Sequence, residues 1–266
     1  MAPAAQSDQK ALEQVVERAL ALAHAGGATA AEAAVGESTG LSVTVRLGEV
    51  ETLEYQRDRS LGVTVYSGQR KGSASTANLT PAAVEETIRK ALSIASFTAD
   101  DEYAGLPDSE LMAGHLPDLD LSHPWELEAS QAVELARRCE AAGLAHDARI
   151  KNSEGASVAT HRKLRVFGNS HGFIGGYPST SHSVSCVVLG QQDGDMQRDY
   201  WYTAARDWRA LEDVESVGRK AADKAVRRLG ADKITTRKAP VLFAPELARG
   251  LIGNFTGAIG GGAQYR

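Results

Sequence analysis

Residues 41–47 read Leu41-Ser-Val-Thr-Val-Arg-Leu47, and this alternation of apolar and polar side chains decides the fold class. Successive side chains of a strand point to opposite faces of a sheet, so a period of two predicts a strand with one buried face. Residues 61–65 repeat the alternation, and a Ser-Gly turn at 67–68 leads into a further strand over 70–76. A weaker pattern over 50–57 predicts one more strand between them.

Helices are predicted on both sides of these strands. Apolar side chains recur at helical spacing over residues 12–23, and Ser7 or Asp8 can cap that helix. Thr80-Pro81 places a capping residue before a proline at the first helical position, which predicts a second helix. One helix, about four strands and a second helix make an N-terminal α+β domain over residues 1–100.

The same order of elements recurs in the second half of the chain. Residues 101–122 are irregular, acidic and contain proline, which predicts a linker. A helix is predicted to open at Ser122-His-Pro124, strands follow from 150 to about 203, and a last helix covers 211–229. Asp193-Gly194 is a hairpin signal between two of these strands.

The tail of the sequence has a different character. It contains a short apolar strand at 241–243, a helix start at Pro245, an apolar helix and a glycine cluster. A strand and a helix with apolar faces need neighbours to cover them, so the tail predicts the start of a C-terminal α/β-type domain and a longer protein. The expected class is α+β, with antiparallel sheets flanked by helices in two successive helix–meander–helix units. The predicted parts are an N-terminal domain at 1–100, a linker at 101–122, a central region at 123–237 and the C-terminal start at 238–266.

Composition and charge exclude several classes of protein. The 266 residues carry a net charge of −5 with an isoelectric point near 5.8, which argues against a large nucleic-acid interface. The sequence has no signal-peptide pattern at its start and no apolar run long enough to span a membrane. Two cysteines are too few for a disulfide framework or a cysteine-based zinc site. We therefore expect a cytoplasmic protein that binds neither nucleic acid nor membrane.

Tests for catalytic or metal-binding motifs in the residues are negative. No pair of histidines has the i, i+4 spacing of a helical zinc protease site, and we interpret His171 and His182, which come closest, as polar strand or turn residues. Cys139 and Cys186 fall on apolar faces, where a free cysteine is inert. No nucleophile elbow is present. The histidines considered are His24, His115, His123, His146, His161, His171 and His182.

Two further stretches invite a phosphate-binding interpretation. The cluster His161-Arg-Lys-Leu-Arg165 alternates with apolar residues, so we expect the solvated face of a strand rather than a phosphate site. Gly257 and Gly262 have the glycine spacing of a P-loop, but Ala263-Gln264 follow where lysine and a hydroxyl residue are needed. We favour close packing of a helix against another backbone for this cluster.

Several segments together resemble the TldD/PmbA family, and more specifically its PmbA (TldE) branch. They are 169–173 (Asn-Ser-His-Gly-Phe), 194–199 (Gly-Asp-Met-Gln-Arg-Asp) with Tyr202, 229–236 (Leu-Gly-Ala-Asp-Lys-Ile-Thr-Thr) and 239–245 (Ala-Pro-Val-Leu-Phe-Ala-Pro) running into Leu251-Ile-Gly. The resemblance implies a three-part protein, of which this chain holds the first domain, the central region and the start of a third.

In the TldD branch, a helix at this point carries a His-Glu-x-x-x-His motif that holds zinc and activates water. The corresponding positions are Gly253, Asn254 and Ala258. Glycine and alanine have no donor atom, and asparagine cannot take a proton from water. The resemblance therefore implies no catalytic, cofactor-binding or metal-binding residue in this chain, with zinc expected only in a TldD-type partner.

The resemblance implies a non-catalytic partner subunit that pairs with a TldD-type catalytic subunit. In the family such assemblies cleave unfolded peptides, including precursors of peptide antibiotics and an antitoxin. Substrate would be held in extended form, with the strand-rich central region as the natural place for contacts. Two alternatives remain open: a truncated inactive remnant, and a self-sufficient hydrolase of another class. Whether the chain is itself an enzyme stays uncertain at this point.

Overall fold

The structure is a computed structural model, and it describes residues 3–114 and 116–265. The chain divides into two compact units, Met1–Gly230 and Ala231–Arg266. Six strands of the first unit form one antiparallel sheet in the order β3-β2-β1-β4-β5-β6. Both predicted helix–meander–helix units contribute to this one sheet, because β1 of the first pairs with β4 of the second. The strands are β1 (Ala30–Arg46), β2 (Glu49–Ser67), β3 (Arg70–Thr76), β4 (Ile150–Asn169), β5 (Ile174–Gln192) and β6 (Asp195–Ala205).

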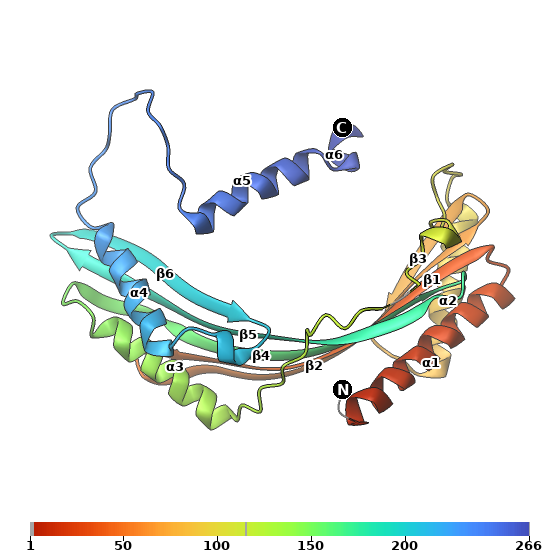
Figure 1. Cartoon of the computed structure of the whole chain (residues 1–266), viewed down its shortest axis with the longest axis horizontal. Coiled ribbons are helices and arrows are strands. Elements are labelled where there is room, and N and C mark those ends of the chain that lie inside the picture. Colours follow the sequence, from red (N-terminus) through yellow and green to blue (C-terminus); the bar gives the residue numbers. More distant parts are fainter. Residues whose placement is uncertain (1–2, 115, 266) are drawn as a thin grey trace. The chain divides into compact units, whose positions relative to one another are not determined.

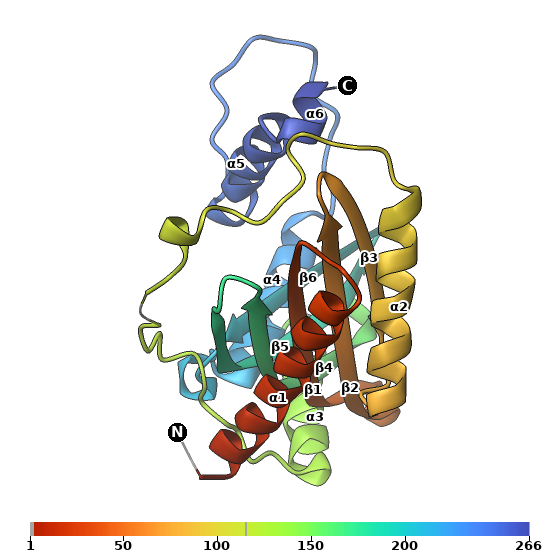
Figure 2. The same cartoon turned by 90° about the vertical axis from the view of Figure 1, so that its right-hand side faces the viewer.

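Four helices cover one face of this curved sheet in two pairs (Figure 1). The pair α1 (Pro3–Ala25) and α2 (Pro81–Phe97) lies over the end of the sheet that includes β3 (Figure 2). The pair α3 (Ala129–Leu144) and α4 (Val214–Arg227) lies over the other end. The antiparallel α+β class with flanking helices is confirmed.

The long strand β1 passes under both helix pairs and so joins two hydrophobic cores. Its side chains Ala31, Ala33 and Val35 belong to the core under α1 and α2. Further along the same face, Leu41 and Val43 belong to the core under α3 and α4. This face of β1 is therefore buried under each helix pair, and it is interrupted between the two cores by Glu37 and Thr39, which are not buried.

Four local predictions are corrected by the structure. The stretch 50–57 is not a separate strand but the first part of β2, which pairs with β1 without interruption apart from one register shift near Val45. The helix expected to open at Ser122 begins at Ala129, because Glu128 and Gln131 form its capping box. The first helix begins at Pro3, ahead of the expected caps Ser7 and Asp8.

The fourth correction concerns the tail. Residues 241–243 are not a strand, since no neighbouring strand of the described chain pairs with them. The unit Ala231–Arg266 contains α5 (Pro245–Ala258), with proline in its first turn as expected, and α6 (Gly261–Tyr265). No residue of α5 is buried. The remaining short elements are the 3-10 turns η1 (Ser109–Leu111) and η2 (Trp208–Ala210).

Candidate functional site

The second face of the sheet is covered by none of the four helices of the first unit. Strand register fixes which side chains lie on it, because directly opposed residues of antiparallel strands point to the same face. Ser38 of β1 lies opposite Asp58 of β2 and Lys163 of β4, and all three point away from the buried face. We call this second face the open face.

The middle of the open face has a floor of very small side chains. Along β1 these are Ala34, Gly36, Ser38 and Gly40 at alternate positions. Side chains of this size leave space above β1 between the longer side chains of its neighbours, as far as Gly40, which the ring of His161 covers. We call this space the β1 groove.

One wall of the β1 groove, which we call the cation wall, is formed by basic side chains on β4, of which Lys163 and Arg165 carry a positive charge at neutral pH. His161, Lys163 and Arg165 occupy alternate positions and lie opposite Gly40, Ser38 and Gly36 respectively. Within the described chain, neither Lys163 nor Arg165 has an ion-pair partner. The imidazole of His161 leans over β1, since a Cβ added at Gly40 would lie 2.4 Å from its ring carbon.

The opposite wall, on β2, is polar and partly acidic. Gln56, Asp58, Ser60 and Gly62 lie across β1 from the cation wall. Asp58 shares a row with Lys163, with Ser38 between them. The β1 groove thus has unlike charges on its two sides, although the chain as a whole is acidic.

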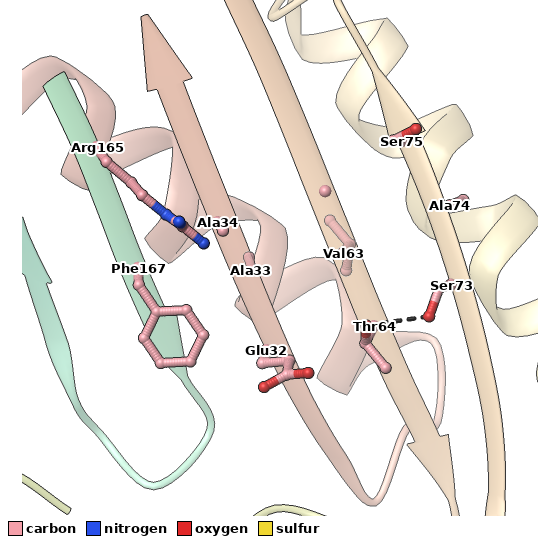
Figure 3. Close-up of a pocket in the computed structure, with 11 residues that line it drawn as sticks. Glu32, Ala33, Ala34, Val63, Thr64, Ser73, Ala74, Ser75, Arg165 and Phe167 are labelled. Carbon is pink, nitrogen blue, oxygen red and sulfur yellow. Dashed lines mark hydrogen bonds between the residues drawn. The ribbon is translucent and has the colours of Figure 1, made fainter. Parts of the chain in front are cut away.

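The groove deepens at one end into a cavity of about 430 Å³. Figure 3 shows Arg165 and Phe167 of β4 reaching toward β1, with Thr64 and Ser73 on the far side joined by a hydrogen bond of 3.0 Å. Glu32 closes the end beyond Phe167. An aromatic ring, a guanidinium group and several hydroxyls therefore surround a floor of small residues.

The positive charge of the cation wall bears on the pKa of His161. Burial lowers the pKa of its imidazole, and the positive charge of Lys163 lowers it further, with a smaller contribution from His182. Among the described residues Lys163 has no ion-pair partner, so its positive charge acts on the neighbouring ring without being neutralised. A bound anion at this wall would oppose that effect.

The three positions that correspond to the zinc motif of the TldD branch belong to the second unit, not to the sheet. Gly253, Asn254 and Ala258 are all exposed residues of α5. None of the three carries an imidazole, thiolate or carboxylate, so these residues do not fit a zinc ion. Among residues 3–114 and 116–265, no three or more His, Cys, Asp or Glu side chains come together as a metal site.

The histidines singled out in the sequence are not brought together. His171 lies at the exposed β4–β5 turn, and His182 is buried in β5. The His182 ring contacts Thr160 Oγ1 and the carbonyl oxygen of His123, each at 2.9 Å, and meets the Trp125 ring edge-on. Because a carbonyl can only accept, Nε2 of His182 donates, and this histidine is a satisfied core residue. His115 lies outside the described residues.

The remaining predicted features have structural roles. Cys139 and Cys186 are buried and free, and their mutual hydrogen bond together with burial raises the pKa of the Cys139 thiol. Both cysteines thus lie in buried positions, as predicted, and their inertness stays a prediction. Asp193-Gly194 forms the β5–β6 turn, with positive φ at both residues. The cluster at 161–165 is part of a strand, as predicted.

The sequence alone did not point to the β1 groove. The clue was the run of small residues Ala34-Val-Gly-Glu-Ser-Thr-Gly40, in which every second residue is small. Glycine within a strand often marks a place where a ligand or another backbone comes close. What the sequence could not give was the register that sets these residues beside the cations of β4.

Comparison with known proteins identifies the family to which this chain belongs. Two family models match the chain: the PmbA/TldA metallopeptidase domain 1 over residues 31–95, and the PmbA/TldA metallopeptidase central domain over residues 122–229. The chain belongs to the PmbA/TldD family. The first model ends inside α2 and the second runs from just before α3 to the end of α4, so both PmbA/TldD domains contribute strands to the single sheet.

Similar proteins support the PmbA side of the family. The chain is 48% identical over 261 residues to Metalloprotease PmbA of Escherichia coli O157:H7, covering 98% of this chain and 58% of the relative. It is 42% identical over 260 residues to a Metalloprotease PmbA homolog of Haemophilus influenzae, covering 98% and 57%. The chain therefore spans less than two thirds of the length of these PmbA relatives.

Solved structures share the fold. A proposed modulator of DNA gyrase from Bacteroides thetaiotaomicron superposes with a TM-score of 0.77 at 26% identity, over 83% of this chain and 51% of that one. TldE from Thermococcus kodakarensis superposes with a TM-score of 0.66 at 20% identity, over 79% and 47%. No described helix of the present chain is long and apolar enough to cross a membrane.

Proposed function

We propose that this chain belongs to a non-catalytic partner subunit of a TldD-type zinc peptidase, and that it holds unfolded peptide while the partner cuts it. The family is one of metallopeptidases, as the names of its models and of the curated relatives state. The observation that carries the proposal is the identity of Gly253, Asn254 and Ala258 at the positions where the resemblance puts the zinc ligands and the base. No water-activating group can be built from those three side chains.

The open face of the sheet supports the peptide-holding part of the proposal. The β1 groove is floored by small residues, and it runs along β1 from the ring of His161 to the cavity beside Arg165 and Phe167. Glycine within a strand often marks a place where another backbone comes close, so this floor can accommodate the backbone of an extended peptide. In the proposed assembly this chain binds and orients the peptide, and the partner supplies the hydrolytic chemistry.

Exposed apolar side chains on α5 support an interface. Leu247, Leu251, Ile252 and Phe255 lie within one helix, and no residue of that helix is buried. Contiguous exposed apolar surface is typical of a site that another protein or domain covers. The remainder of the third domain that the resemblance implies is the first cover to expect for this surface, and the TldD-type subunit, expected in the cytoplasm, is proposed to bind the completed protein.

Reconstitution tests the proposal directly. The full-length protein and a TldD-type subunit would be purified separately, and zinc content and cleavage of an unfolded peptide would be measured for each alone and for the mixture. We expect stoichiometric zinc in the partner only, and cleavage that rises when the two are mixed. Cleavage by the present protein alone, lost on substitution of its own histidines, would overturn the proposal in favour of a self-sufficient hydrolase. No effect of this protein on the partner would instead identify an inactive remnant.

A further inference from the structure

We propose that the β1 groove selects peptides that carry acidic side chains on alternate residues, which pair with Lys163 and Arg165. This inference deepens the proposed function, on which it rests, by naming the class of peptide that the open face holds. It is argued from the spacing of the cations, from their lack of partners and from two glycines that the fold itself does not need.

The basic side chains of the groove wall have the spacing of alternate residues in an extended peptide. His161, Lys163 and Arg165 stand on one face of β4 at every second residue. Strand residues rise about 3.3 Å each, so neighbouring side chains on one face are roughly 6.6 Å apart along the strand. A peptide lying extended along β1 presents its own alternate side chains with the same repeat. Two carboxylates separated by one residue can therefore meet Lys163 and Arg165 together.

These two cations are free to bind a partner. The chain has more acidic than basic residues, and most of its exposed arginines nearby in sequence pair within the protein, as Arg162 does with Glu126. Lys163 and Arg165 are exposed, yet within the described chain no carboxylate lies within ion-pair distance of either. A charge-assisted contact from a bound carboxylate would supply the missing partner.

Two glycines of the groove are not explained by backbone or packing. Gly36 and Gly62 lie in strand interiors and neither has positive φ. A Cβ added at Gly62 would meet no atom within 4 Å, and one added at Gly36 would meet its nearest atom at 3.6 Å, an ordinary contact. Glycine in a strand interior costs about 0.5–1 kcal/mol relative to alanine. The fold thus has room for a Cβ at both positions, and what glycine provides there is open space in the groove.

The acidic wall restricts which peptides fit. Asp58 faces Lys163 across Ser38, so a peptide with carboxylates on both of its sides would place some of them near a like charge. A peptide with acidic residues at every second position turns all of its carboxylates to one side. We therefore expect the alternating arrangement to bind better than a block of the same acidic residues.

Fluorescence anisotropy with the full-length protein and labelled synthetic peptides tests the inference. The probe alternates glutamate with serine, and two isomeric controls carry the same glutamates in one block or replace them with glutamine. We expect the alternating peptide to bind at least tenfold more tightly than either control. Equal binding of all three peptides would overturn the inference.

Matched variants locate the site. K163Q/R165Q removes two positive charges from the groove, and K10Q/R18Q removes two exposed charges from α1, on the other face of the sheet. We expect the first to weaken binding of the alternating peptide at least tenfold and the second to leave it within about twofold, after screening of long-range effects at 0.15 M salt. Equal losses in both variants would contradict a groove site.

Gly62→Val fills the groove without removing charge. Because a Cβ at this position meets no atom within 4 Å and valine is favoured in strands, the variant should fold with an unchanged or raised melting temperature while losing at least tenfold in binding. A folded variant that binds like the wild type would overturn the inference. Failure of these binding tests leaves the reconstitution result of the proposed function untouched, so the two can fail separately.

Discussion

Replacing Glu140 by alanine should loosen the β1–β2 turn and lower the free energy of unfolding by about 3 kcal/mol. Glu140 of α3 is 1% exposed, and its carboxylate accepts hydrogen bonds from the backbone N–H groups of Leu47 at 2.8 Å and Gly48 at 2.9 Å. Both turn residues have positive φ, 51° and 80°. Glu140 therefore joins a helix of the central family domain to a turn of the first.

The magnitude follows from those two contacts. A hydrogen bond to a charged group contributes about 1.5–3 kcal/mol, so two of them contribute about 3–6 kcal/mol. The lower end applies because Leu47 is 58% exposed, and water can reach the turn once the carboxylate is gone. Glu140→Gln keeps one acceptor oxygen and should lose roughly half as much.

Urea denaturation of the wild type and the variants measures the effect. Glu134→Ala is the matched control, because Glu134 is an exposed residue of the same helix. For a unit of this size, about 3 kcal/mol corresponds to a fall of roughly 6–12 °C in melting temperature. A loss below about 1 kcal/mol for Glu140→Ala, or one equal to that of Glu134→Ala, would refute the reasoning.

Three further predictions concern glycines and a histidine. Gly72→Ala should lower the free energy of unfolding by several kcal/mol in urea denaturation, because its Cβ would lie 2.1 Å from the carbonyl oxygen of Ala91. Gly62→Ala should instead raise the free energy of unfolding by about 0.5–1 kcal/mol, because its Cβ would meet no atom within 4 Å. Gly218→Ala should lower the free energy of unfolding for the same reason as Gly72→Ala, because its Cβ would lie 2.0 Å from a backbone oxygen of α3. An unchanged urea midpoint would contradict the close packing of α3 and α4. The pKa of His161 is lowered in the folded state, so the unfolded chain binds the proton more readily. The free energy of unfolding should therefore fall as the pH drops from about 6.5 to the folded-state pKa, and it should not change further through this group at lower pH. His161→Gln should reduce that fall, and NMR titration should give an imidazole pKa below 6.5 that rises in K163Q.

Much of the fold could be predicted from local pattern. The alternation at 41–47 gave a strand with one buried face, and Pro81 and Pro245 marked the starts of helices that the structure contains. The first part of β2 was harder to predict from the sequence. Residues 49–60 are exposed on both faces of the strand, so their apolar and polar side chains follow no clear period. The predicted strand at 241–243 is wrong for a different reason. An apolar run predicts burial, but it does not show whether a partner strand exists.

The single sheet could not be predicted because it depends on long-range pairing. The β1–β4 ladder joins Val43 to Val158, residues that lie far apart in the chain. A one-residue shift of that register would turn every side chain of β4 to the other face. The cations of the candidate site were therefore visible in the sequence as the solvated face of a strand, but their position beside Gly36 and Ser38 was not.

The central claim is that the full-length protein holds an extended peptide on the open face of the sheet while a partner cuts it. Site-specific photocrosslinking tests this most directly, with a photoreactive side chain at Ser60 on the groove wall and, as control, at Glu85 on the exposed side of α2. Labelled unfolded peptide would be added together with the TldD-type subunit, and crosslinked peptide mapped by mass spectrometry. The account predicts crosslinks from position 60 and none above background from position 85. Crosslinks from position 85 alone, or equal yields from both, would contradict it.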